Sequence, residues 1–190
     1  MRVFKDKGFL SPDEIIDDPS AHIRADWFGR ALGWDLYARV SLTKTTLRFE
    51  VVTDLPLVPA AKQTQFCEGL WNTEVFELFI HSDTSKRYWE YHLSPSGDWW
   101  FSAFSDYRRV EASAGISSNA VDVLSNAYQG WNYRGIAYSP IPLDFHEGDE
   151  LPILFSGILN SGNEKLYLAS VPPQCGSPDF HRRDLVQIGR

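Results

Sequence analysis

The stretch that decides the fold runs from Trp71 to Arg108 and reads WNTEVFELFIHSDTSKRYWEYHLSPSGDWWFSAFSDYR. Residues of different character alternate through most of it, which is typical of β-strands whose side chains point to two faces. Two short breaks rich in Asp, Ser, Pro and Gly indicate turns. The stretch therefore predicts three consecutive antiparallel strands, at Glu74–Ser82, Arg87–Ser94 and Asp98–Asp106.

The alternation divides the first two strands into two rows of side chains. The apolar row consists of Phe76, Leu78 and Ile80 in the first strand and Trp89, Tyr91 and Leu93 in the second. The other row mixes aromatic rings with carboxylates and consists of Val75, Glu77, Phe79, Tyr88, Glu90 and His92. We expect the apolar row to face the core and the mixed row to face a ligand or solvent.

The rest of the chain adds further short strands with turn signals between them. They are expected at Asp35–Leu42, Thr46–Thr53, Ala120–Ala127, Trp131–Ser139, Ile153–Leu159, Lys165–Val171 and Leu185–Ile188. About ten strands with almost no helical periodicity predict an all-β fold, an antiparallel β-sandwich or barrel. No linker or repeat divides the chain, so residues 1–190 are expected to form one domain. Residues 1–33 are expected to be an N-terminal extension with a short helix, which begins at Ser11-Pro12-Asp13-Glu14.

Composition restricts the classes of partner. The 190 residues carry a net charge of −7 without a basic stripe, which argues against nucleic acid. No run of 18 apolar residues exists, so no membrane span is expected. The first residues contain no apolar signal-peptide core, so a cytoplasmic location is expected. The two cysteines, Cys67 and Cys175, show no metal-site spacing, and free thiols are favoured over a disulfide.

Aromatic residues are abundant, with seven Trp, eight Tyr and twelve Phe. Most of these rings are expected to fill the core, as in any single domain. Seven tryptophans nevertheless exceed what packing needs, and indole is the preferred platform for flat apolar ligand faces, including those of sugar rings.

Several pieces of the chain, in their order and spacing, resemble the DOMON-like superfamily and, within it, domains related to carbohydrate-binding module family nine. The pieces are Leu70-Trp71, Val75–Phe79, Tyr88–Glu90, Leu93–Gly97, Trp99, Phe104, Tyr107-Arg108 and the tail Pro178–His181. The resemblance is strong over about 40 residues. It implies a β-sandwich of two antiparallel sheets that holds its ligand in a concave face or at its rim.

The resemblance also implies site residues. Family nine modules clamp a terminal sugar between two tryptophans and add hydrogen bonds from charged and amide side chains. Trp71 and Glu77 are similar to the Trp and Glu of that site. Arg108 is a weaker match for a hydrogen-bonding cation, and Trp131 is a weaker match for the second ring. Some other DOMON relatives bind haem.

Glu77 and Glu90 fall on nearby positions of one face if their strands pair about residues 84 and 85. Three roles are open to such a carboxylate pair. It could accept hydrogen bonds from sugar hydroxyls, form ion pairs with Arg87, Arg108 or Arg109, or catalyse glycoside hydrolysis. Binding and structural roles are favoured over catalysis, because a catalytic acid needs a deep, dry pocket.

The other candidates also have structural alternatives. Trp71 either stacks on a sugar or seals the end of the sandwich. Arg108 either contacts a ligand or, slightly favoured, pairs with Glu77 or Glu90 in a buried ion pair. Trp99 and Trp100 are adjacent and must point to opposite faces, so Trp99 is expected in the core and Trp100 is left for a surface role.

No cofactor or metal is expected. Haem ligation by His and Met is excluded because Met1 is the only methionine, although a bis-His pair among His81, His92, His146 and His181 stays open. Metal ligation by a lone His is disfavoured, and no His-x-x-x-His or Cys-x-x-Cys spacing raises it. A structural calcium at a loop carboxylate such as Asp83 also stays open.

The sequence therefore favours a non-catalytic ligand-binding domain for a carbohydrate or other polyhydroxylated small molecule. Its candidate ligand-binding residues are Trp71, Glu77, Glu90, Trp100, Arg108 and Trp131. The alternatives are a sugar-processing enzyme that uses the carboxylate pair and a protein-interaction module. The sequence carries no signal for an oligomeric state.

Overall fold

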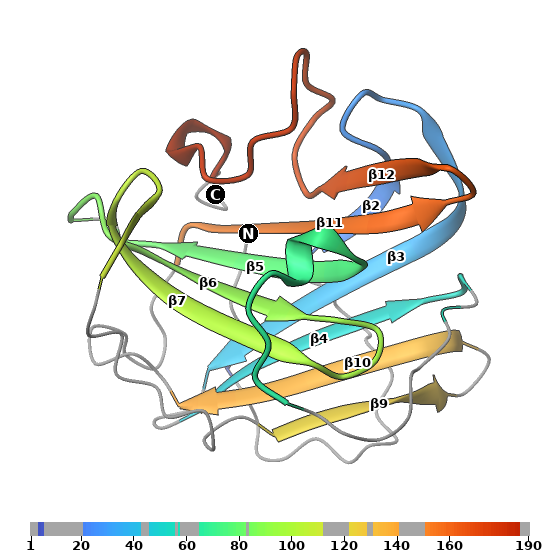
Figure 1. Ribbon diagram of the computed structural model, residues 1–190, viewed down its shortest axis with the longest axis horizontal. Coiled ribbons are helices and arrows are strands. Elements are labelled where there is room, and N and C mark those ends of the chain that lie inside the picture. The colour runs from blue at the N-terminus through green and yellow to red at the C-terminus, as the bar shows by residue number, and fades with distance from the viewer. Residues whose placement is uncertain are drawn as a thin grey trace.

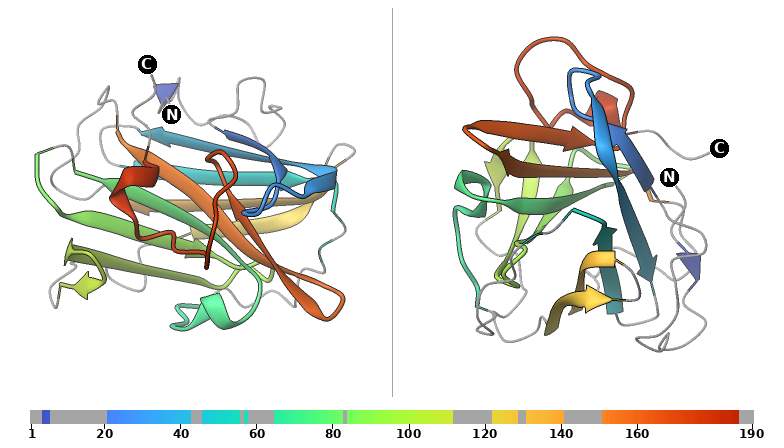
Figure 2. Two further views of the ribbon diagram at one scale, coloured as in Figure 1. Left: turned by 90° about the horizontal axis from the view of Figure 1, so that it is seen from above. Right: turned by 90° about the vertical axis from the view of Figure 1, so that its right-hand side faces the viewer.

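The computed structural model describes residues 4–5, 21–42, 46–55, 57, 65–82, 84–111, 122–128, 131–140 and 151–186; at 4–5, 42, 122–128, 131–132 and 140 it describes the backbone alone. These residues form a β-sandwich of two sheets (Figure 1). Figure 2 shows the two layers from the side. In this part of the chain the helices are two single 3-10 turns, and no helix has the length and hydropathy of a membrane span.

The first sheet has the order β1-β3-β4-β10-β9, and β2 pairs with β3 beside this path. Its strands are antiparallel except for the two-residue β1. They are β1 (Phe4–Lys5), β2 (Ala21–Ala25), β3 (Ala31–Leu42), β4 (Thr46–Thr53), β9 (Asp122–Tyr128) and β10 (Trp131–Pro140).

The second sheet has the order β12-β11-β5-β6-β7-β8 and is antiparallel throughout. Its strands are β5 (Val75–His81), β6 (Tyr88–Leu93), β7 (Trp99–Asp106), β8 (Arg109–Val110), β11 (Ile153–Ser161) and β12 (Glu164–Ala169). The stretch from Trp71 to Arg108 thus supplies β5, β6 and β7 of one sheet, as predicted.

The core between the sheets is built from the predicted apolar row. Phe76, Leu78 and Ile80 of β5 are fully buried there, as are Trp89 and its row on β6, against side chains of the first sheet. Burial of such side chains stabilises the fold by roughly 1.5–3 kcal/mol each. The alternation of the sequence therefore fixes which face of the second sheet is core.

A second hydrophobic cluster covers the outer face of the second sheet. Its members come from the mixed row and from loop segments, and include Trp27, Leu70, Val75, Phe79, Tyr88, Trp100, Phe104, Phe180 and Leu185. Two segments lie over this face: the 3-10 turn η1 (Leu70–Asn72) and residues 171–186, here called the C-terminal segment (Figure 1). These two segments therefore cover part of the outer face and leave an open space between them.

Contacts to Trp27 hold the C-terminal segment in place. The indole Nε1 donates to the Gly176 carbonyl at 3.2 Å, and the Trp27 carbonyl accepts from the Gln174 backbone at 2.7 Å. The indole ring also packs edge-on against Phe180, with ring centroids 5.4 Å apart. A residue in the turn before β3 thus anchors a segment about 150 residues later in the chain.

Three expectations are wrong. Residues 1–33 contain β2, in which only Ala21 and Ile23 are buried, so its apolar alternation is too short to signal a strand. β3 begins at Ala31, before the expected start at Asp35. The expected closing strand at Leu185–Ile188 is wrong at its start, because Leu185 ends a 3-10 turn, η2 (Arg183–Leu185); residues 187–188 lie outside the described residues. Leu185 is buried in the outer cluster and pairs with no strand there. The expected helix at Ser11 lies outside the described residues.

Candidate functional site

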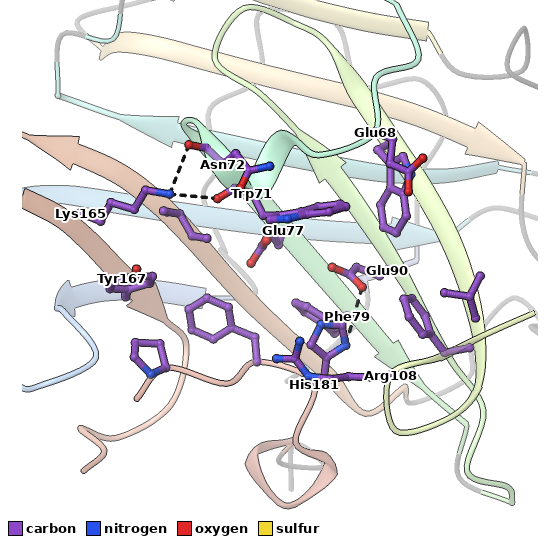
Figure 3. A pocket seen from close by; sticks show the side chains of 16 residues that line it. Glu68, Trp71, Asn72, Glu77, Phe79, Glu90, Arg108, Lys165, Tyr167 and His181 are labelled. Carbon is purple, nitrogen blue, oxygen red and sulfur yellow. Dashed lines mark hydrogen bonds and ion pairs between the residues drawn. The ribbon is translucent and has the colours of Figure 1, made fainter. Parts of the chain in front are cut away.

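A cavity of about 530 Å³ opens on the outer face of the second sheet (Figure 3). Side chains of β5, β6 and β7 form its floor, and η1 and the C-terminal segment form its walls. This volume lies in the range of small-molecule sites. Five of the six predicted residues line this cavity: Trp71, Glu77, Glu90, Trp100 and Arg108.

The floor carries a cluster of two carboxylates and one imidazole: Glu77, Glu90 and His92. Glu77 of β5 pairs with His92 of β6, and Phe79 of β5 pairs with Glu90, so the three polar side chains occupy one face of the sheet. His92 Nε2 lies 2.6 Å from Glu90 Oε1 and 3.4 Å from Glu77 Oε1. The expected proximity of Glu77 and Glu90 is therefore confirmed.

Burial makes the charges of this cluster interdependent. Burial, the largest influence, raises the pKa of the Glu77 carboxyl, whereas the charge of His92 lowers it. The net effect raises this pKa to about 7. Burial alone would lower the pKa of His92, but the hydrogen bond to Glu90 and the charges of both carboxylates outweigh it and raise the pKa. The cluster therefore holds protons that solvent-exposed groups of the same types would release near neutral pH.

One carboxylate oxygen of the cluster accepts no hydrogen bond from any described residue. Ser156 Oγ on β11 donates to Glu77 Oε2 at 2.8 Å, which fixes that carboxylate. Glu90 is only 4% exposed, yet its Oε2 accepts no hydrogen bond from any described residue. The nearest imidazole on that side is His181, whose Nδ1 lies 3.8 Å away. A buried carboxylate oxygen without a donor is costly unless a ligand, ion or water satisfies it.

Trp71 stands above this floor. Gly69 takes a left-handed backbone conformation, with φ 87°, and turns the chain into η1 so that Leu70 is buried while Trp71 stays 38% exposed. The Trp71 ring meets His92 and Trp100 edge-on, with centroids 5.8 Å and 5.6 Å away. A ring that is half open beside a cavity is suited to stacking, and less to the alternative role of a plug.

The two adjacent tryptophans point to opposite faces, as predicted. Trp99 is 3% exposed and lies in the core between the sheets. Trp100 lies in the outer cluster and lines the cavity, but it is 9% exposed, so most of its ring is covered rather than free at the surface.

Arg108 lies at the rim of the cavity, and the expected buried ion pair with Glu77 or Glu90 is wrong. Its guanidinium, with the side chain 54% exposed, binds Asp179 of the C-terminal segment at 3.1 Å. Its backbone has φ 53° in the turn between β7 and β8, which aims the side chain along the rim. Of the other two expected partners, Arg87 pairs with Glu111, and Arg109 is exposed in β8.

His181 closes the wall on the Arg108 side. The Arg108 backbone N–H donates to the Tyr88 hydroxyl at 3.1 Å, so the hydroxyl proton is free to donate to His181 Nδ1 at 2.7 Å. Burial lowers the pKa of His181, which agrees with a neutral ring that accepts this bond. The site therefore contains a second imidazole, which is hydrogen-bonded to Tyr88.

Lys165 and Phe180 also line the cavity, and sequence reasoning misses both. Lys165 Nζ donates to the carbonyl oxygens of Trp71 and Asn72 at 3.3 Å and 3.2 Å, and thereby ties η1 to β12 (Figure 3). Phe180 lies in the tail Pro178–His181, which is one of the pieces that resemble the family. Its place beside the cavity depends on how the C-terminal segment packs on the sheet, which the sequence does not show.

The remaining candidates lie elsewhere or outside the described residues. Trp131 begins β10 in the first sheet, and its side chain is not among those described. Asp83, the residue named for the open calcium alternative, and His146, one of the four haem candidates, are also outside the described residues. Both cysteines are free thiols. The expectation of no cofactor, with calcium and haem as open alternatives, stays a prediction.

Comparison with solved structures confirms the sandwich fold and the resemblance to family nine modules at the level of fold. A "putative carbohydrate-binding protein" from Bacteroides uniformis superimposes with a TM-score of 0.71, at 13% identity over 98% of this chain and 95% of that one. A family nine carbohydrate-binding module from Caldicellulosiruptor kristjanssonii, solved in complex with glucose, gives a TM-score of 0.57, at 10% identity over 90% of this chain and 86% of that one.

Comparison with curated sequences finds the UPF0462 protein C4orf33 homolog of Mus musculus, which is 29% identical over 154 residues. The match covers 76% of this chain and 76% of the mouse protein. No model of a protein family matches the chain.

Proposed function

We propose that the cavity binds a carbohydrate or another polyhydroxylated small molecule without transforming it. The observation that carries this proposal is the position of the half-exposed Trp71 ring beside two buried carboxylates on one cavity floor. Sugars present an apolar ring face and a set of hydroxyl donors, and these two features match an indole and carboxylate oxygens.

Each residue then has a definite role. Trp71 stacks on the apolar face of the ring. Glu90 Oε2, which lacks a donor among the described residues, accepts a hydrogen bond from a hydroxyl, and Glu77 offers a second acceptor. Arg108, half exposed at the rim, donates to a ligand oxygen with the guanidinium N–H groups that Asp179 leaves free.

The two fold neighbours support this ligand class. The Bacteroides uniformis structure is that of a "putative carbohydrate-binding protein", and the family nine module was solved in complex with glucose. Their identity to this chain is low, so the support comes from the shared architecture together with the residues that line this cavity.

The geometry does not favour glycoside hydrolysis. Hydrolases place their two carboxyl groups on either side of the scissile bond, roughly 5–9.5 Å apart. Here both carboxylates lie side by side on one sheet face and approach the same His92 nitrogen, at 2.6 Å and 3.4 Å. Product formation that disappears in Glu77→Gln would nevertheless identify an enzyme.

Trp71→Ala tests the proposal. A glycan array first identifies a neutral sugar that the wild type binds. Loss of stacking should then weaken binding of that sugar by about 1–1.5 kcal/mol, which is roughly tenfold in Kd. Isothermal titration calorimetry measures the change, and Trp71→Phe should bind with intermediate affinity.

Phe28→Ala is the matched control, because Phe28 is also exposed, at 50%, but does not line the cavity. It should bind as the wild type does. Equal affinity of Trp71→Ala and wild type, with both proteins folded by circular dichroism, would contradict stacking. Absence of any glycan that binds would favour the protein-interaction module instead.

A further inference from the structure

We propose that Glu77, Glu90 and His92 form a binding site for one divalent transition-metal ion of the zinc class on the cavity floor. One donor atom from each of the three buried side chains lies within 4.8 Å of the other two. Two adjacent strands supply them: β5 gives Glu77, and β6 gives Glu90 and His92 two positions apart on the same face. Three donors on a rigid sheet are a stable basis for a metal site.

The distances suit a small ion after minor adjustment. Zinc binds nitrogen and carboxylate oxygen at roughly 2.0–2.2 Å, so two of its ligand atoms lie at most about 4.3 Å apart. The separation of 3.4 Å between His92 Nε2 and Glu77 Oε1 already fits this arrangement. The 2.6 Å contact between His92 and Glu90 lengthens when the metal displaces the shared proton to solvent. Rotation of the terminal carboxylates supplies the remaining adjustment, because that torsion is soft.

The charge of the deprotonated cluster matches a divalent cation. When the ion replaces the protons that the cluster holds, two carboxylates and a neutral imidazole carry a charge of −2, which one divalent cation brings to zero. Burying an uncompensated charge is expensive. Among the described residues, the cationic side chains at the cavity are engaged elsewhere, Arg108 with Asp179 and Lys165 with carbonyl oxygens of η1.

The surroundings orient the three donors. Ser156 Oγ holds one oxygen of Glu77 and leaves the other toward His92, a supporting contact of the kind that ligating carboxylates have. The His92 ring packs against both Trp71 and Trp100, which restricts its plane. The Glu90 oxygen without a donor belongs to the same cluster and is the independent sign of a missing partner.

The donor set and the cavity define the ion and its open position. Calcium and magnesium prefer oxygen ligands, whereas one imidazole with two carboxylates suits zinc and its first-row neighbours. Three protein ligands leave a fourth position, as in zinc sites that hold water or substrate. Glu77 and Glu90 line the cavity, so that position faces the space where a ligand oxygen would lie.

The proposed metal site shares Glu77 and Glu90 with the proposed sugar site, so its test uses the metal alone and needs no sugar. Protein without a polyhistidine tag is stripped with a chelator and titrated with Zn²⁺ by calorimetry and with Co²⁺ by visible absorption. We expect one ion per chain and the d–d bands of a low-coordinate Co²⁺ centre. In Glu90→Gln and in Glu77→Gln the affinity should fall by more than the roughly 10–100-fold that loss of a supporting group costs.

Glu68→Gln is the matched control, because Glu68 lines the same cavity but is not one of the three donors. It should bind the metal as the wild type does. The isosteric Glu→Gln changes are checked for folding by circular dichroism. The proposal is overturned if the folded wild type binds neither ion stoichiometrically, or if the double variant Glu77→Gln, Glu90→Gln keeps the wild-type affinity and spectrum.

Discussion

At the scale of single residues, three histidine side chains with little exposure to solvent lie on or against the outer face of the second sheet. His81, His92 and His181 lie on or against this face, and each has a different electrostatic setting. His92 is held by carboxylates, and His181 accepts a bond from Tyr88. His81 is 1% exposed and stacks on Tyr88, and neither of its ring nitrogens has a partner among the described residues.

His81 should make the protein sensitive to acid. Burial, assisted by the charges of Arg183 and His181, lowers the pKa of His81 to about 4 from an ordinary 6.5. Between these two values the unfolded chain binds a proton that the folded chain does not, so stability falls as the pH drops from about 6.5 to about 4. His81 therefore lowers the free energy of unfolding by about 3 kcal/mol as the pH falls through that range.

His81→Phe tests this prediction. The variant keeps a ring against Tyr88 and removes the titrating group together with two unpartnered polar atoms. Urea unfolding at pH 7 and pH 4.5 should show a smaller loss of unfolding free energy in the variant than in the wild type. Parallel losses in the two proteins would show that His81 is not the acid-sensitive group.

At the scale of elements, packing across the sandwich depends on the absence of a side chain at one position of β10. A Cβ atom at Gly135 would lie 2.9 Å from Cζ of Tyr133 and closer still to its hydroxyl, and 3.1 Å from Leu93 on the opposite sheet. Tyr133 is fully buried, so its ring has no space into which to move. Gly135 therefore lets the Tyr133 ring lie over its own strand and reach β6.

Gly135→Ala should destabilise the fold by about 1–3 kcal/mol, the range for overpacked cores. Gly33→Ala in β3 is the control, because a Cβ there meets nothing within 4 Å. That substitution should be neutral or stabilise by up to about 1 kcal/mol through the unfolded state. Chemical denaturation of both variants measures the difference, and equal unfolding free energies would refute this account of Gly135.

At the scale of the whole molecule, the fold has two hydrophobic clusters with different functions. The cluster between the sheets makes the sandwich, whereas the outer cluster attaches η1 and the C-terminal segment and so creates the cavity. The C-terminal segment contains no strand, and Phe180 is its main buried aromatic side chain. We therefore expect this segment to open without unfolding of the sandwich.

Phe180→Ala should reveal that local opening. Removal of the ring from Trp27 and the outer cluster should speed amide hydrogen exchange in residues 171–186 and weaken ligand binding. Exchange in β5 and β6 should stay slow and serves as the internal reference. Equal acceleration in β5 and β6 would show instead that the segment and the sandwich unfold as one unit.

The candidate site was only partly predictable for a physical reason. Glu77, Glu90 and His92 share a strand face, and alternation along the sequence is enough to place them together. Lys165 and Phe180 reach the cavity from segments far apart in the sequence, and no local pattern reports such contacts. Arg108 was expected to pair with Glu77 or Glu90, but the turn after β7 carries it to Asp179.

The sequence by itself determined the sandwich class, the pairing of β5, β6 and β7, and which of their faces is core, because a period of two assigns every side chain to a face. The tertiary structure alone decided that the opposite face is a walled cavity rather than an open surface. That outcome depends on Trp27 binding the C-terminal segment across some 150 residues, a contact between segments that share no local pattern.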